Sequence, residues 1–218
     1  MDFILFTTAL VILLLAGCGV VLLIVPPRYA LSMPELLSLS ILFGAAFISL
    51  TSFITGLLFS GATLRWIIAL AGLAAGATGV AVRRRQGTGS IYALPSRMEV
   101  LLLAVLLIVQ TVIVSWWSFN SQLGGDGLAI WDIKARLAYL NGGAIPLSYF
   151  SDPTRIWSHP KSPLCLPLVE AWFYGWLGRA DQELIKLVFP LFYVAALGLL
   201  YVGCAQNCST GSTVIYAM

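Results

Sequence analysis

The chain has 218 residues, of which 60% are hydrophobic and only 10% are charged. Soluble globular domains carry about a quarter charged residues, so this composition excludes an ordinary soluble domain and indicates a membrane protein. The formal net charge of +3 is small, and the loops that carry the lysines and arginines are more informative than this total.

Six apolar stretches are candidates for membrane spans, because a spanning helix needs about 20 apolar residues. They cover residues 3–25, 36–59, 64–82, 100–119, 164–178 and 185–205. The fifth stretch is short, is interrupted by Pro167 and carries Glu170. The predicted fold class is therefore all-α, a polytopic transmembrane helical bundle of about six spans. The apolar stretch 209–218 suggests the start of a seventh span, so we expect the sequence to be the N-terminal fragment of a longer chain.

The stretch LLAGC, which ends at Cys18, matches a bacterial lipoprotein cleavage box. A signal peptide has a basic start and a short apolar core, whereas this segment starts with Asp2 and stays apolar beyond the cysteine. We therefore expect an ordinary first span. The other cysteines are Cys165, Cys204 and Cys208. Because no histidine cluster accompanies the four cysteines, small apolar packing is the default interpretation, and no metal ligands are assigned.

Arginines predict which side of the membrane each loop faces. The residues that share one short loop are Arg83, Arg84, Arg85 and Arg97. Cytoplasmic loops collect such charges, so residues 83–98 are predicted to face the cytoplasm. Alternation then predicts the same inner side for Arg28, Arg179 and Lys186, and the outer side for the N-terminus, the 60–63 turn and the 120–163 segment. An aromatic belt at the outer end of the fourth span agrees, and consists of Trp116, Trp117 and Phe119.

Two blocks are predicted. Residues 1–97 form an N-terminal block of three spans with a cytoplasmic arginine-rich linker. Its run of small residues from Ala71 to Gly79 permits close helix packing. Residues 98–218 hold one span, the long outer loop 120–163 and two further spans.

Residues 127–140 of the outer loop are predicted to form a helix. The apolar residues that cover much of one side are Leu128, Ile130, Trp131, Ile133, Leu137 and Leu140. Asp126 is a typical N-cap, and Asn141 to Gly143 are typical of a helix stop. The element is too short and too charged to span, so we expect an interfacial amphipathic helix with its apolar side towards the membrane.

Simpler interpretations of these charges are kept open. Asp126 can be only a cap, and Asp132 and Arg136, four residues apart, can form a simple helix pair. The cations that can merely meet anionic headgroups are Lys134, Arg155, His159 and Lys161. Glu170 lies about two turns into a predicted span, where an ionisable group usually faces a cavity or a partner; a lone buried polar contact is the alternative.

Two stretches, DGLAIWDIKARLAYLNGG and HPKSPLCLPLVEAW, together resemble the GT-C superfamily of integral-membrane glycosyltransferases. The similarity is to bacterial members related to the protein mannosyltransferases and the lipid A aminoarabinose transferase, and it covers about residues 98–205. The matching positions are Asp126, Trp131, Lys134, Ala135, His159, Lys161, Pro163, Leu164 and Pro167.

The resemblance implies an enzyme that moves a sugar from a polyprenyl-phosphate donor to an acceptor hydroxyl or amine on the outer face of the membrane, normally with inversion. It makes Asp126 the general base, or the group that orients the acceptor. The residues assigned to the lipid phosphate or the substrate are Lys161, His159, Arg155, Lys134 and Glu170. Cations aimed at a leaving phosphate stabilise its growing negative charge.

The sequence departs from the superfamily pattern at several points. Gly127 follows Asp126 where many relatives carry a second acid, and KSPL stands where a paired proline is common. Three spans precede the similar region, and relatives usually have about twice as many spans in total. Some members need a divalent cation, so a metal requirement is left open, although the six-residue spacing of Asp126 and Asp132 puts them on different faces of a helix. No other cofactor is implied.

The implied partners are a polyprenyl-phosphate-linked sugar, membrane lipid, and an acceptor glycan, lipid or protein. The expected location is the bacterial inner membrane, with residues 120–163 on the outer side. The alternative function is a non-catalytic membrane protein, such as a transporter or flippase component or an assembly scaffold. Nucleic-acid binding is excluded, because the basic run is short and lies against a membrane span.

Overall fold

In a computed structural model the chain forms a bundle of helices, and the structure describes residues 1–27, 29, 31–86, 97–121 and 124–207. Its long helices are α1 (Asp2–Ile24), α2 (Met33–Thr55), α3 (Gly61–Gln86), α4 (Arg97–Asn120) and α8 (Val188–Asn207). The segments long and apolar enough to cross a membrane are Asp2–Ile24, Met33–Thr55, Gly61–Arg85 and Leu184–Gly203, and α4 adds the shorter apolar stretch Val105–Asn120. The described residues contain no strand, which confirms the predicted all-α membrane bundle.

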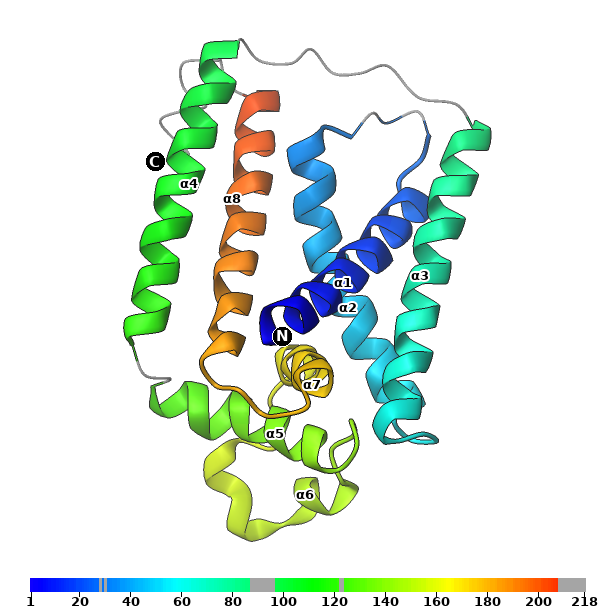
Figure 1. The fold of residues 1–218 in the computed structure, drawn as a ribbon, viewed down its shortest axis with the longest axis vertical. Helices are drawn as coiled ribbons and strands as arrows, with labels where there is room; N and C mark the ends of the chain where they lie inside the picture. Colours follow the sequence, from blue (N-terminus) through cyan, green and yellow to red (C-terminus); the bar gives the residue numbers. More distant parts are fainter. Residues whose placement is uncertain (28, 30, 87–96, 122–123, 208–218) are drawn as a thin grey trace.

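The shorter elements gather after α4. They are η1 (Gly127–Asp132, a π-helix), α5 (Ile133–Leu140), α6 (Leu147–Ser151), η2 (Pro153–Ser158), α7 (Cys165–Leu177) and η3 (Leu184–Leu187). Figure 1 shows them at one end of the bundle, together with the turn between α2 and α3. The C-terminal end of α3 and the start of α4 lie at the opposite end. We call these the loop end and the arginine end.

This arrangement agrees with the predicted separation of the 120–163 segment from the arginines of α3. Which side of the membrane each end faces stays a prediction. Arg28 and most of the predicted linker, 87–96, lie outside the described residues, as does the predicted seventh span at 209–218.

The predicted fifth span at 164–178 is wrong. Helix α7 has 13 residues, which gives a length of about 20 Å, against about 30 Å for the hydrocarbon core of a bilayer. It ends at Gly178, whose φ of 71° is the left-handed conformation that commonly terminates helices. In Figure 1 the helix is seen nearly end-on, across the long axis of the molecule.

The position of the following residues changes as a consequence. Because α7 does not cross the bundle, the segment between α7 and α8 lies towards the loop end and not at the arginine end (Figure 1). Arg179 and Lys186 belong to this segment, so their predicted position is wrong. One guanidinium nitrogen of Arg179 lies 2.7 Å from the carboxylate of Asp2 and 2.7 Å from that of Asp181. Lys186 donates to Glu183 at 2.9 Å.

Helix α1 packs against α2 and α3 through glycines. A Cβ atom added to Gly17 would lie 1.9 Å from the carbonyl oxygen of Ser40 on α2. A Cβ added to Gly19 would lie 2.2 Å from the carbonyl oxygen of Ala75 on α3, and one added to Gly79 would lie 2.4 Å from that of Gly19. Backbones this close require residues without side chains, which confirms the close packing predicted from the run Ala71 to Gly79.

The hydrophobic core mixes the two predicted blocks. Helix α7 packs against α1, α2 and α3, and the rings of Phe6 and Phe173 stack with centroids 4.5 Å apart. The indole N–H of Trp172 donates to the carbonyl oxygen of Ala9 at 3.2 Å. Residues before and after 97 therefore share one core. Helix α7 belongs to this core, and η1 and α5 of the loop end pack against α7.

Candidate functional site

Residues 127–140 are helical, as predicted, in the form of η1 followed by α5. Asp126 occupies the N-cap position, but its side chain makes no capping hydrogen bond, and it is exposed. The first six residues form a π-helical segment. Such segments are rare and occur frequently at functional sites. Asp126 thus has an exposed carboxylate that makes no capping hydrogen bond, and it lies directly before the π-helical segment.

The buried side of this helix differs from the predicted apolar side. Its buried residues are Asp132, Lys134, Ala135 and Ala138. Leu128 and Leu140 are instead 39% and 75% exposed. The alanines allow α5 to lie close against α7, and polar partners on the facing elements compensate the buried charged groups. The helix does lie across the loop end of the bundle, as Figure 1 shows.

Lys134 holds the loop together from inside. Its side chain is fully buried, and its ammonium nitrogen donates to the carbonyl oxygen of His159 at 2.8 Å and to the hydroxyl of Ser162 at 2.5 Å. The ammonium also lies 5.7 Å from the centre of the Trp131 ring. Burial lowers the pKa of Lys134. This geometry favours a positioning role for Lys134 over direct contact with a lipid phosphate.

His159 and Lys161 line one open groove of about 560 Å³. Both side chains are exposed. His159 has a φ of 47°, which is uncommon for a residue other than glycine, and this turn follows η2 directly. The groove is also lined by Asp152 and Ser162. The structure therefore brings together two of the predicted phosphate-binding residues. They lie on a turn to which Lys134 donates hydrogen bonds, at the His159 carbonyl and the Ser162 hydroxyl.

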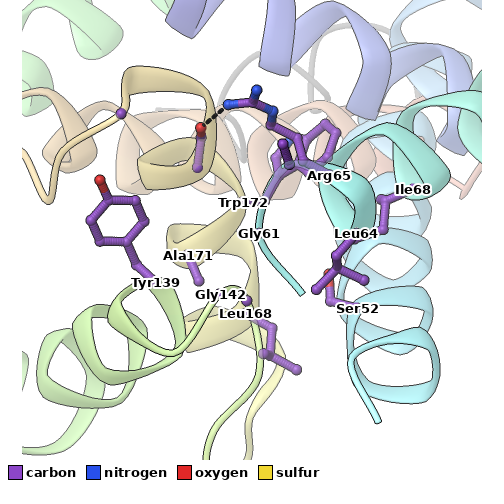
Figure 2. Close-up of a pocket in the computed structure, with 14 residues that line it drawn as sticks. Ser52, Gly61, Leu64, Arg65, Ile68, Tyr139, Gly142, Leu168, Ala171 and Trp172 are labelled. Atoms are coloured by element: carbon purple, nitrogen blue, oxygen red, sulfur yellow. Dashed lines mark hydrogen bonds between the residues drawn. The ribbon is translucent and has the colours of Figure 1, made fainter. Parts of the chain in front are cut away.

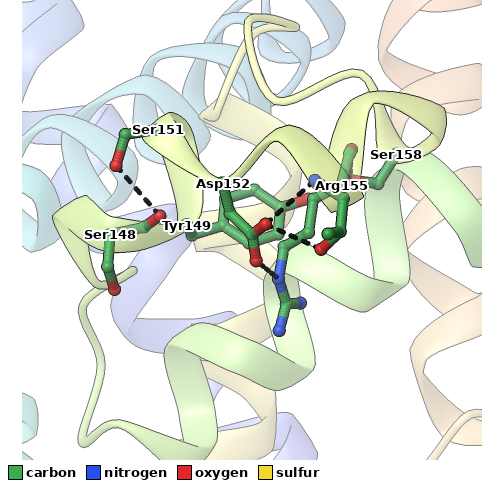
Figure 3. A network of polar contacts seen from close by, with 7 residues as sticks. Ser148, Tyr149, Ser151, Asp152, Arg155 and Ser158 are labelled. Atoms are coloured by element: carbon green, nitrogen blue, oxygen red, sulfur yellow. Dashed lines mark hydrogen bonds and ion pairs between the residues drawn. The ribbon is translucent and has the colours of Figure 1, made fainter.

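Arg155 lies beside this groove in a network with Asp152 and Tyr149 (Figure 3). Its Nε donates to the Asp152 carboxylate at 3.1 Å, and its guanidinium lies 5.4 Å from the centre of the Tyr149 ring. Hydrogen bonds from Thr154 are the main reason that the pKa of Asp152 is lowered. Arg155 is only partly exposed and has an acidic partner already, so it is less free than Lys161 to bind a phosphate.

Asp132 accepts hydrogen bonds from two residues that sequence analysis did not identify. The hydroxyl of Tyr174 donates to one carboxylate oxygen at 2.6 Å, and the side-chain amide of Gln182 donates to the other at 2.6 Å. The ion pairs in the described part of the chain do not include the pair of Asp132 with Arg136 that sequence analysis left open as an alternative. Asp132 is therefore a structural acceptor that joins α5 to α7 and to the segment before η3.

Glu170 lies on α7, outside the spanning helices, and is 2% exposed. Its Oε2 atom is buried without a hydrogen-bond partner. Burial, with a smaller contribution from the charge of Asp132, raises the pKa of Glu170 to about 8. Glu170 does not line the groove that contains His159 and Lys161. Its predicted contact with substrate stays a prediction.

The loop end thus has an outer and an inner layer. The outer layer contains the exposed Asp126, His159 and Lys161, and the inner layer contains Lys134, Asp132 and Glu170. Within the described ranges, no three histidine, cysteine, aspartate or glutamate side chains lie together as a metal site would require. Tyr174, Gln182 and Ser162 are partners that single-sequence patterns do not reveal, because each contact joins residues 28 to 50 positions apart.

Comparisons with protein-family models, with curated proteins and with solved structures find no match for this chain. The geometry of the loop end is therefore the basis for a functional interpretation.

Proposed function

We propose that the chain is a GT-C-like membrane glycosyltransferase, or the N-terminal part of one, which moves a sugar from a polyprenyl-phosphate donor to an acceptor outside the membrane. The observation that carries the proposal is the layered loop end. The exposed carboxylate of Asp126 and the exposed groove that His159 and Lys161 line belong to one segment, and Lys134 joins helix α5 to the turn at His159 through the His159 carbonyl.

The proposed reaction uses these groups in a defined order. A hydroxyl or amine of the acceptor attacks the anomeric carbon while its proton passes to the Asp126 carboxylate. The bond from that carbon to the phosphate oxygen breaks, and the lipid phosphate leaves with the electron pair. Lys161, with His159 or Arg155, stabilises the negative charge that grows on the phosphate. The lipid tail stays in the bilayer throughout, because residues 150–162, which line the groove, belong to the loop end and lie beyond the spanning helices (Figure 1).

The proposed location is the bacterial inner membrane, with the loop end outside. There the groove meets a lipid-linked sugar and a glycan, lipid or protein acceptor. Support comes from the arginines of α3, which lie at the opposite end of the bundle and follow the positive-inside rule if that end is cytoplasmic.

A transfer assay tests the proposal. Membranes containing the chain are incubated with a polyprenyl-phosphate donor that carries a labelled sugar, and the released lipid phosphate is measured. Loss of a general base typically costs 10²- to 10⁴-fold in rate, so Asp126→Asn should reduce turnover by roughly that factor. Asp2→Asn removes the same charge from a partly exposed residue that the proposed mechanism does not use, and should leave turnover unchanged. Undiminished transfer by Asp126→Asn would remove Asp126 from the mechanism.

Glu170 favours a second candidate, a transporter or flippase component. A buried ionisable group with a perturbed pKa often marks a functional site, and Oε2 of Glu170 is buried without a hydrogen-bond partner. A transporter tolerates Asp126→Asn but loses activity with Glu170→Gln. The glycosyltransferase instead loses activity with Asp126→Asn. An assembly scaffold tolerates both substitutions.

A further inference from the structure

A cavity of about 250 Å³ lies between α3 and α7 at the loop end (Figure 2). Its walls come from the ends of α2 and α5, the first turns of α3, and one face of α7. Of the residues that line it, none lines the groove that contains His159 and Lys161. The cavity is therefore separate from the proposed transfer site.

Arg65 gives this cavity a positive charge without a matching negative one. One of its terminal nitrogens donates to the carbonyl oxygen of Gly175, as the dashed line in Figure 2 shows. Its Nε atom is buried without a hydrogen-bond partner. The ion pairs in the described part of the chain do not include Arg65. A carbonyl dipole leaves the full charge of the guanidinium uncompensated.

Two indole rings hold the guanidinium in place. Its central carbon lies 5.3 Å from the centre of the Trp176 ring and 5.9 Å from that of Trp66. Such cation–π contacts orient an arginine but do not neutralise it. A partly buried cation in low-dielectric surroundings costs free energy unless an anion pairs with it. Arginine recognises phosphate particularly well, because its planar fork donates two parallel hydrogen bonds.

The other walls of the cavity are mostly apolar, with Ser52 and Tyr139 as the residues that carry hydroxyl groups. Leu64, Ile68, Leu168 and Trp172 line it together with small residues. Arg65 is the fifth residue of α3, so it lies about 6 Å along the helix from its start. That distance corresponds to the interfacial layer of a bilayer, where lipid phosphates lie. The volume is below the range of about 300–1,000 Å³ of pockets that enclose a whole drug-sized ligand, so an occupant places only part of itself here.

We propose that this cavity binds the phosphate headgroup of an anionic phospholipid, with Arg65 on the phosphate and the apolar wall on the adjoining part of the lipid. The lipid would join α3 to α7, the helix on which the loop end rests. This site is independent of the proposed transfer reaction, because its residues have no part in that mechanism.

Native mass spectrometry of the purified full chain, exchanged from detergent micelles into phosphatidylglycerol or phosphatidylcholine, tests the proposal. The wild-type chain should retain one phosphatidylglycerol in preference to phosphatidylcholine by about tenfold, because the choline cation of phosphatidylcholine competes with Arg65 for the same phosphate and cancels its net charge. Arg65→Gln should lose this preference, and Arg65→Lys should keep part of it. Arg85→Gln is the matched control, since it removes the same charge from an exposed site at the other end of α3.

A second variant keeps the charge and fills the cavity. A Cβ added to Gly175 meets only the Cδ atom of Arg65, at 3.9 Å, so there is space for a side chain at this position. Gly175→Leu should therefore block retention of the lipid while Arg65 is unchanged. Equal retention of both lipids by the wild type, or an unchanged preference in Arg65→Gln, would overturn the proposal. Displacement of the lipid by inorganic phosphate would also overturn it, because the ligand would then be an anion from solution.

Discussion

Replacing Lys134 by methionine tests whether the inner layer of the loop end positions the outer one. Methionine keeps the apolar stem and removes the ammonium group. The loss is two hydrogen bonds, to the His159 carbonyl and to the Ser162 hydroxyl. A hydrogen bond that involves a charged group contributes about 1.5–3 kcal/mol.

Two effects reduce the expected cost. Burying an ammonium group costs free energy on folding, and methionine avoids this cost. The Ser162 hydroxyl also donates to the His159 carbonyl at 2.6 Å, so neither acceptor is left without a partner. We therefore expect a net cost of about 2 kcal/mol, taken from the lower part of that range. At 1.4 kcal/mol per factor of ten, the turn should open roughly 30-fold more often.

Hydrogen exchange of the chain in micelles measures this opening. The amides of His159 and Ser162, which donate to Ile156 and His159, should exchange roughly 30-fold faster in Lys134→Met. Lys161→Met is the matched control, because Lys161 is exposed and lines the groove from outside. Equal exchange rates in Lys134→Met and the wild type would refute the positioning role of Lys134.

Three further predictions concern stability, each followed by thermal unfolding in micelles. Tyr174→Phe removes the donor to the buried Asp132 carboxylate and should destabilise the chain by about 1–3 kcal/mol; a smaller loss would indicate that the Asp132 contact is not needed. Burial raises the pKa of Glu170 from 4.5 to about 8, so the unfolded chain loses this proton first. Stability should therefore fall as pH rises between these values, by up to about 1.4 kcal/mol per pH unit, and Glu170→Gln should remove this component of the slope. A slope that is the same in both chains would contradict the assignment. Gly17→Ala places a methyl group 1.9 Å from a carbonyl oxygen of α2 and should cost at least about 1–3 kcal/mol. Its control is Gly203→Ala, where the added Cβ meets nothing within 4 Å.

The sequence predicted the features that depend on local pattern. The long spans follow from apolar runs, the helix at 127–140 from its flanking glycines and Asp126, and the close packing of α1 on α3 from the small residues of 71–79. For the spans and for this helix, the physical cause lies within one stretch of chain. The small residues of 71–79 predicted close packing but did not identify α1 as the partner.

The errors arose where distant contacts decide the outcome. Hydrophobicity alone made 164–178 a span, but the chain turns back after the 13 residues of α7, and the placement of Arg179 was then wrong as well. The buried side of α5 was predicted from its leucines, whereas the acceptor Asp132 and the small alanines determine it. Sequence analysis did not single out Arg65, although it is a charged residue at the start of the predicted span 64–82.

The most direct test of the proposed function is the side of the membrane that the loop end faces. A single cysteine at Ser151, which is exposed in the described structure, is labelled in intact cells with a membrane-impermeant thiol reagent. The four native cysteines are first replaced by serine; they are Cys18, Cys165, Cys204 and Cys208. The proposal predicts labelling from outside, where polyprenyl-linked sugars are used. Labelling only after the cells are broken would put Asp126 and Lys161 in the cytoplasm, contradict the glycosyltransferase proposal and favour a transporter or scaffold.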